Sequence, residues 1–88
     1  MYQTAPTSRF KSDVKKYTRR KDREEIKRVL SELMRGEWLP GRKHHRLRGE
    51  YVGYWECHVR PNILLIYKLD DVNMKVSLVR IGSHSELF

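Results

Sequence analysis

Apolar residues recur at helical spacing early in the chain, after a short segment that suits an extended strand. Residues 2–5 form this first predicted strand, which Pro6 ends, and Ser8 is placed as the N-cap of a following helix. The apolar side of that helix carries Phe10, Val14 and Tyr17 at i, i+4 and i+7. The pattern therefore predicts a strand followed by an amphipathic helix.

A second amphipathic helix is predicted to begin near Asp22, because Asp22 and Glu25 have the spacing of a capping box. Its apolar stripe consists of Ile26, Val29, Leu30 and Leu33. Gly36 is a typical residue just beyond a helix C-terminus. With the basic turn of residues 19–21 between them, the two helices are expected to form a hairpin that lies on a sheet.

After Pro40 and Gly41 the period changes from helical to extended. Residues 51–59 alternate between two faces, so that Glu56 and His58 share one face while Cys57 and Val59 lie on the other. This alternation predicts a strand with one side in the core.

Two further strands complete the pattern. Residues 63–67 are apolar on both faces and suit a central strand, and residues 75–81 form the last one. Turns are indicated at residues 60–62 and 70–73. The predicted order is β-α-α-β-β-β, an α+β domain whose helical hairpin covers one side of a mostly antiparallel sheet.

The chain is short and strongly basic. Its 88 residues suit one domain, and 19 Lys and Arg against 11 Asp and Glu give a net charge of +8. Such an excess points to RNA, DNA, an acidic protein or an anionic membrane as partner. No apolar run reaches the roughly 20 residues that span a bilayer, and the N-terminus lacks the apolar segment of a signal peptide. We expect a soluble cytoplasmic protein.

Cys57 is the single cysteine, so an internal disulfide framework is excluded and a reducing compartment fits. Its position between Trp55 and Val59 favours a buried apolar residue over a nucleophile. The histidine spacings match no compact zinc pattern, and no second cysteine is present. We therefore expect neither a metal nor another cofactor.

Positive charge concentrates in residues 15–21 and 42–48. Clustered cations bind a nucleic-acid backbone by pairing with phosphate oxygens and releasing counterions. For residues 15–21 an ordinary solvated helix face is an equally good interpretation. The second segment is more suggestive because it includes His44 and His45 just before a strand.

Histidine gives and takes protons near neutral pH, so its placement on a basic surface suggests acid–base chemistry on a phosphodiester. Cleavage of RNA needs one group that takes the 2′-hydroxyl proton, one that protonates the leaving 5′-oxygen, and a cation near the phosphorane. Residues of these types are His45, His58, His84, Arg46, Arg48, Arg60 and Arg80. Each histidine taken alone is more often structural or merely exposed.

Aromatic residues offer a further signal, since they can stack on unpaired bases or pack in the core. They are Tyr51, Tyr54, Trp55, Tyr67 and Phe88. Core packing is the better interpretation for Trp55 and Tyr67. An ordered Phe88 at the chain end would pack beside His84 or contact substrate.

Four ordered motifs resemble the YafQ branch of the RelE toxins. They are HRLRGEYVGY at 45–54, ECHVRPN at 56–62, LIYK at 65–68 and RIGSHSELF at 80–88. Members of this branch are the toxin halves of bacterial type II toxin–antitoxin pairs and have a microbial-ribonuclease-like α+β fold. The resemblance covers nearly the whole domain and is strongest from His45 to Phe88.

The resemblance implies a ribosome-dependent endoribonuclease that cuts mRNA in the A site and is inhibited by a cognate antitoxin. His45, His58, His84 and Phe88 match residues important for cleavage in that branch. We expect His58 and His45 to supply the base and a phosphate contact, and His84 the general acid. His44 is expected to be a bystander.

The chain departs from the family pattern at three positions. Asn62 and Ile63 stand where such toxins often carry Asp-Trp, and Arg46 replaces a common proline. Asn62 can hydrogen-bond to RNA but cannot act as a carboxylate base, whereas Ile63 cannot stack as a tryptophan would. Arg46 adds a cation near the expected site.

Two other functions fit the same fold class. A ParE-like toxin acts on DNA gyrase without cutting RNA, but it has no need of His45, His58 and His84. A basic RNA-binding module without catalysis would depend on Lys and Arg residues and would tolerate loss of His84.

Overall fold

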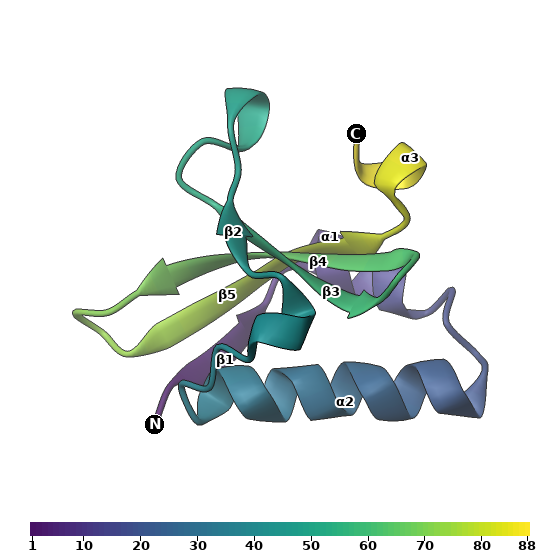
Figure 1. Cartoon of the computed structure of the whole chain (residues 1–88), viewed down its shortest axis with the longest axis horizontal. Coiled ribbons are helices and arrows are strands. Elements are labelled where there is room, and N and C mark those ends of the chain that lie inside the picture. Colours follow the sequence, from purple (N-terminus) through teal and green to yellow (C-terminus); the bar gives the residue numbers. More distant parts are fainter.

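The computed structural model describes all 88 residues and contains a five-stranded sheet with helices on both of its faces (Figure 1). The strands are β1 (Gln3–Pro6), β2 (His45–Arg46), β3 (Trp55–Arg60), β4 (Ile63–Asp70) and β5 (Lys75–Gly82). The α-helices are α1 (Ser8–Val14), α2 (Arg20–Met34) and α3 (His84–Leu87), and the 3-10 helices are η1 (Pro40–Arg42) and η2 (Gly49–Tyr51). The mostly antiparallel α+β prediction is confirmed.

The strand order across the sheet is β1-β5-β4-β3-β2. Only β1 and β5 run parallel, and the other three pairings are antiparallel. The apolar segment predicted as the central strand is β4, which lies in the middle of the sheet and buries Ile63 to Tyr67. A strand with neighbours on both sides and layers on both faces requires apolar residues at successive positions.

The main core lies between the sheet and helices α1 and α2. Phe10 from α1 joins Ile26, Val29 and Leu33 from α2 in one buried cluster. The sheet contributes Cys57, Val59, Ile63, Leu65, Tyr67, Val76, Leu78 and Ile81. No helix of the structure is long and apolar enough to cross a membrane.

A smaller cluster covers the opposite face of the sheet. Leu64 and Ile66 of β4 pack there against Leu87 of α3. Tyr51 and Tyr54, from the loop between β2 and β3, cover the same cluster. Figure 1 shows this loop and α3 rising from one face of the sheet while α2 lies along the other. The face with α3 carries the candidate site.

The helix boundaries differ from the sequence predictions. The N-cap of α1 is Thr7, whose hydroxyl accepts a hydrogen bond from the Phe10 amide at 3.1 Å, so Ser8 is the first helical residue. The helix ends at Val14, and Tyr17 lies beyond it in the connection. The side chain of Thr7 also donates to the Val79 carbonyl at 3.0 Å, which ties the cap to β5.

The second helix begins at Arg20, earlier than expected, and its N-cap Arg19 makes no capping hydrogen bond through its side chain. The predicted capping box at Asp22 is therefore wrong: Asp22 lies in the first turn, where a carboxylate is favourable near the helix N-terminus. The predicted C-terminal stop is confirmed, since Gly36 has φ 71°.

Two sheet boundaries also differ. The strand predicted from residue 51 begins at Trp55, because Tyr51 belongs to η2. The alternation within it is confirmed, with Cys57 and Val59 buried in the main core and His58 on the other face. Pro6 is the last residue of β1 and does not lie beyond it. The short elements β2, η1, η2 and α3 were not predicted.

Arg42 attaches the segment after α2 to the rest of the fold. Its guanidinium binds both carboxylate oxygens of Glu32 at 3.0 Å, Glu25 at 2.8 Å and the Val59 carbonyl at 2.9 Å. Hydrogen bonds to Glu32 raise the pKa of Arg42 against the opposing effect of burial, and Glu25 adds to the rise. The network fixes η1, and with it the short strand β2 that bears His45.

Candidate functional site

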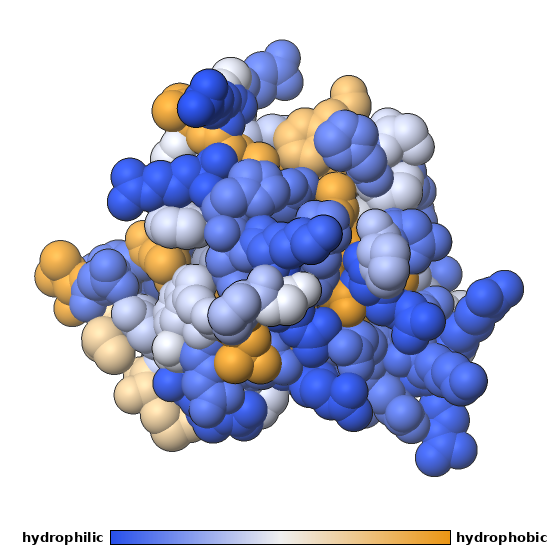
Figure 2. Space-filling view, in the orientation of Figure 1, coloured by the Kyte–Doolittle hydropathy of each residue, from blue (hydrophilic) through white to orange (hydrophobic).

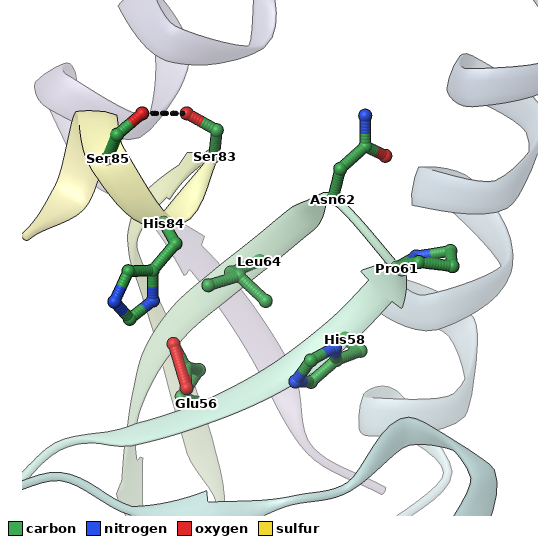
Figure 3. A pocket seen from close by; sticks show the side chains of 8 residues that line it. All are labelled: Glu56, His58, Pro61, Asn62, Leu64, Ser83, His84 and Ser85. Atoms are coloured by element: carbon green, nitrogen blue, oxygen red, sulfur yellow. Dashed lines mark hydrogen bonds between the residues drawn. The ribbon is translucent and has the colours of Figure 1, made fainter.

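An open pocket of about 660 Å³ lies on the α3 side of the sheet. Its walls come from β3, the β3–β4 turn, β4 and the start of α3. The lining residues are Glu56, His58, Pro61, Asn62, Leu64, Ser83, His84 and Ser85. Figure 3 shows the His84 ring directed toward Glu56, with His58 farther along the same strand. Two histidines and one carboxylate therefore share one cavity.

The pocket reaches His45 through Glu56. The two residues are register partners in the β2–β3 pair, and His45 Nε2 lies 2.9 Å from Glu56 Oε2. His45 Nδ1 lies 3.0 Å from the Lys43 carbonyl oxygen, which can only accept, so Nδ1 carries a proton.

The second oxygen of Glu56 has no hydrogen-bond partner in the protein. Glu56 is only 5% exposed, and its Oε1 is buried without any hydrogen-bond partner. Burial of a carboxylate oxygen without a hydrogen-bond partner costs free energy, and such an atom often has a functional role. Because Glu56 lines the pocket beside His84, this unpaired oxygen is a candidate to accept a proton from a bound molecule.

His84 is the first residue of α3, and the local sequence explains why that short helix forms. Ser83 and Glu86 make a reciprocal capping box: the Ser83 hydroxyl accepts from the Glu86 amide at 3.3 Å, and Glu86 Oε1 accepts from the Ser83 amide at 2.7 Å. Leu87 anchors the helix on the sheet. The imidazole of His84 is thereby held at the mouth of the pocket.

Phe88 packs beside His84, which is one of the two positions expected from the sequence. Its ring centroid lies 5.0 Å from that of His84 and 5.6 Å from that of Tyr51, in a T-shaped contact. Tyr51 in turn packs edge-on against Tyr54 at 6.0 Å. Phe88 remains 54% exposed, which leaves part of its ring free to contact a base.

His44 points away from the pocket and has a structural role. Its Nδ1 hydrogen-bonds to the Tyr67 hydroxyl at 2.6 Å, and its ring packs near Trp38. Desolvation lowers the pKa of His44, so the buried ring is favoured in its neutral form. The two adjacent histidines are thus separated by strand alternation, with only His45 facing Glu56.

The predicted arginines are dispersed, and none lines the pocket. The Arg46 guanidinium stacks over Trp55 at 5.2 Å, beside a different cavity. Arg48 is the exposed residue before η2. Asp13 binds Arg80 at 2.7 and 3.2 Å and raises its pKa. Arg60 is the last residue of β3 and pairs with Asp22 at 3.4 Å.

Glu56 is a candidate site residue that was not predicted from the sequence. The alternation of β3 put it on the same face as His58, which was the available signal. Its importance depends on two facts that a strand pattern does not contain: the contact with His45 on another strand, and the burial that leaves Oε1 unpaired.

The chain is similar to known proteins. Residues 2–88 match the family model described as the bacterial toxin of type II toxin–antitoxin systems, YafQ. A relative in Escherichia coli K12, named mRNA interferase toxin YafQ, is 35% identical over 85 residues, covering 93% of this chain and 90% of that protein.

Solved structures agree with this match. The crystal structure of YafQ from E. coli BL21(DE3) superposes with a TM-score of 0.88 at 28% identity, covering 100% of this chain and 99% of that one. YafQ in the E. coli DinJ–YafQ complex gives 0.86 at 31% identity, again over 100% of this chain and 99% of that one.

Proposed function

Because the chain belongs to the YafQ family of type II toxins, we propose that it is the toxin half of such a pair and cleaves mRNA as an endoribonuclease. The observation that carries this proposal is the pocket in which His84 faces Glu56, a buried carboxylate with one unpaired oxygen. A group able to take a proton and a group able to give one stand on either side of the space for a phosphodiester.

The reaction is an in-line transesterification. Glu56 Oε1 takes the proton of the 2′-hydroxyl, and the 2′-oxygen forms a bond to the adjacent phosphorus. The bond from phosphorus to the 5′-oxygen breaks, and the imidazolium of His84 donates its proton to that leaving oxygen. The products are a 2′,3′-cyclic phosphate and a 5′-hydroxyl, with no metal or oxidant consumed.

His45 and His58 support this exchange. His45 keeps Glu56 in place through the 2.9 Å contact. His58 lines the same wall of the pocket and is placed to donate a hydrogen bond to the phosphate. This assignment moves the general base from the histidines, where the sequence put it, to Glu56.

The ribosome supplies what the domain lacks. The pocket is open and holds no Lys or Arg to orient a flexible RNA or to balance the charge of the phosphorane. Fixing the mRNA in the A site would remove much of the entropic barrier to in-line attack. We therefore propose that the enzyme cuts mRNA only on the ribosome and acts in the cytoplasm.

A cognate antitoxin is the expected partner. Relatives of this chain have been solved as the DinJ–YafQ toxin–antitoxin complex. The net charge of +8 favours an antitoxin with an acidic contact surface, which would also cover the cations that attract RNA.

Translation in a purified system tests the proposal. The protein is added to ribosomes translating a defined mRNA, and the new 5′ ends are mapped. We expect cuts in register with codons, 5′-hydroxyl ends, and no cleavage when ribosomes are omitted. Absence of registered cuts would overturn the proposal, and inhibition of DNA gyrase in a separate supercoiling assay would then favour the ParE-like alternative.

A further inference from the structure

A second pocket continues from the first around the β3–β4 turn. It has a volume of about 350 Å³ and lies between that turn, the α1–α2 connection and the start of α3. Its lining residues are Tyr17, Arg19, Asp22, Arg60, Asn62, Ile63, Ser83 and Glu86. Asn62 and Ser83 line both cavities, so the two pockets adjoin at these residues, and together we call them the groove.

The cations in this second pocket are more available than its carboxylates. Arg19 takes part in none of the ion pairs of the structure. Arg60 makes a single contact with Asp22 at 3.4 Å, and its side chain is 42% exposed. Glu86 is occupied by the Ser83 amide at 2.7 Å, with Lys16 at 3.9 Å from its other oxygen.

The remaining polar groups are neutral. Burial, followed by the nearby charges of Glu86 and Asp13, raises the pKa of Tyr17, so its phenol keeps its proton. Asn62 is exposed at the turn, and Figure 3 shows its amide directed away from His84 and Glu56. At this junction an amide can donate to a phosphate oxygen, whereas a carboxylate would repel it.

From this groove we propose that the second pocket, through Arg19 and Arg60, binds a phosphate of the mRNA next to the one that is cleaved. The inference rests on the proposed function, because it takes the first pocket to hold the scissile phosphate. A single-stranded RNA has phosphates at every nucleotide, so a strand seated at His84 and Glu56 continues over Asn62. The guanidinium groups of Arg19 and Arg60 then contact the RNA backbone, whereas the first pocket contains no arginine.

The surface around this pocket agrees with a polyanionic ligand. Hydrophilic side chains surround the end of α2 that follows the connection from α1 (Figure 2). Residues 15–21, for which the sequence left phosphate binding and a solvated helix face equally open, supply this part of the surface. An acidic protein segment would fit the same charges, but the continuity with the cleavage pocket favours RNA.

Arg19→Ala tests the proposal, and Arg20→Ala is its matched control. The two residues are neighbours at the start of α2 and lose the same charge, but Arg20 is an exposed partner of Glu24 outside the pocket. Neither substitution removes a capping hydrogen bond. In ribosomal cleavage we expect Arg19→Ala to raise KM about tenfold with kcat little changed, and Arg20→Ala to resemble wild type.

Neutral methylphosphonates, placed one at a time at the phosphates flanking the cleaved bond, identify the contact itself. We expect one position at which the neutral linkage raises KM for wild type and for Arg20→Ala but not for Arg19→Ala. If no position depends on Arg19, or if Arg19→Ala cleaves with the wild-type KM, the inference is overturned.

Failure of this inference is distinguishable from failure of the proposed function. Codon-registered cutting by wild type and by both variants at the same KM would leave the nuclease intact and remove only the second phosphate site. Weaker binding of an antitoxin by Arg19→Ala, with unchanged cleavage, would reassign the pocket to a protein partner and equally overturn the inference.

Discussion

His45 and Glu56 meet across the β2–β3 pair, with His45 Nε2 2.9 Å from Glu56 Oε2. This contact leaves the other oxygen of Glu56 unpaired in the wall of the pocket. The arrangement resembles a base held by a second group, a common design for proton transfer. It makes Glu56 the residue on which the proposed chemistry depends most.

Replacing Glu56 with Gln removes the proton acceptor while keeping the side-chain shape. We expect the cleavage rate on ribosomes to fall about 10²- to 10⁴-fold, the usual contribution of a general base. Glu50→Gln is the matched control, because Glu50 is an exposed glutamate in the adjacent loop and loses the same charge. A Glu56→Gln protein that is folded and cleaves like wild type would contradict the assignment.

Removing Arg42 should loosen the segment that carries His45. Arg42→Ala leaves Glu32, which is 4% exposed, without a cation, whereas Glu25 keeps its pair with Arg28. We expect the free energy of unfolding to fall by about 3–5 kcal/mol, as for other broken buried pairs. Urea unfolding measures this loss. Arg42→Lys should lose less, because it keeps the charge but not the paired hydrogen bonds.

Asp13 should make part of the stability depend on pH. Burial alone would raise its pKa, but hydrogen bonds from Arg80 and the Ile81 amide, with the charge of Arg80, lower it below the ordinary value. The ionised form is thus favoured in the folded state. The contribution is fully present above an unfolded-state pKa of about 3.9 and is lost as pH falls through the lower folded pKa.

The substitution Asp13→Asn checks this sign. At pH 7 we expect Asp13→Asn to be less stable than wild type by about 2 kcal/mol, the scale of a hydrogen bond to a charged group. Below pH of about 4 the difference should shrink, because Asp13 of the unfolded wild-type chain takes up a proton there, whereas the folded protein does so only at lower pH. Urea unfolding at several pH values gives both quantities. A difference that is constant with pH would show that the charge of Asp13 does not matter.

Cys57 should be inert in the native protein. It is fully buried in β3, and desolvation raises the pKa of its thiol to about 12. The thiolate is the reactive form, so an aromatic disulfide reagent at pH 8 should label Cys57 only after denaturant unfolds the chain. Stoichiometric labelling of the native protein would mean that β3 opens readily.

The sequence predicted those features that depend on local period. Alternation in β3 predicted Cys57 in the core and His58 on the opposite face, and the doubly apolar segment predicted β4 as a central strand. The four-residue helix α3 was missed because it contains too few residues to show a period, although Ser83 and Glu86 form its capping box.

Features that require contacts between distant residues were not predictable. Arg42 lay within a basic segment that suggested phosphate binding, yet two glutamates of α2 bind its guanidinium. Arg80 is likewise bound by Asp13, which is 67 residues away in the chain. Because a charged residue in a sequence does not reveal its partner, the number of free cations near the site was overestimated.

If His84 and Glu56 together cut mRNA, single-turnover cleavage on programmed ribosomes should depend on His84. Wild type and His84→Ala are compared at saturating protein, after thermal unfolding has shown that both are folded. We expect His84→Ala to cleave at least about 10²-fold more slowly at the same codon, as loss of a general acid requires. Equal rates for the two proteins would contradict the role of His84 in cleavage.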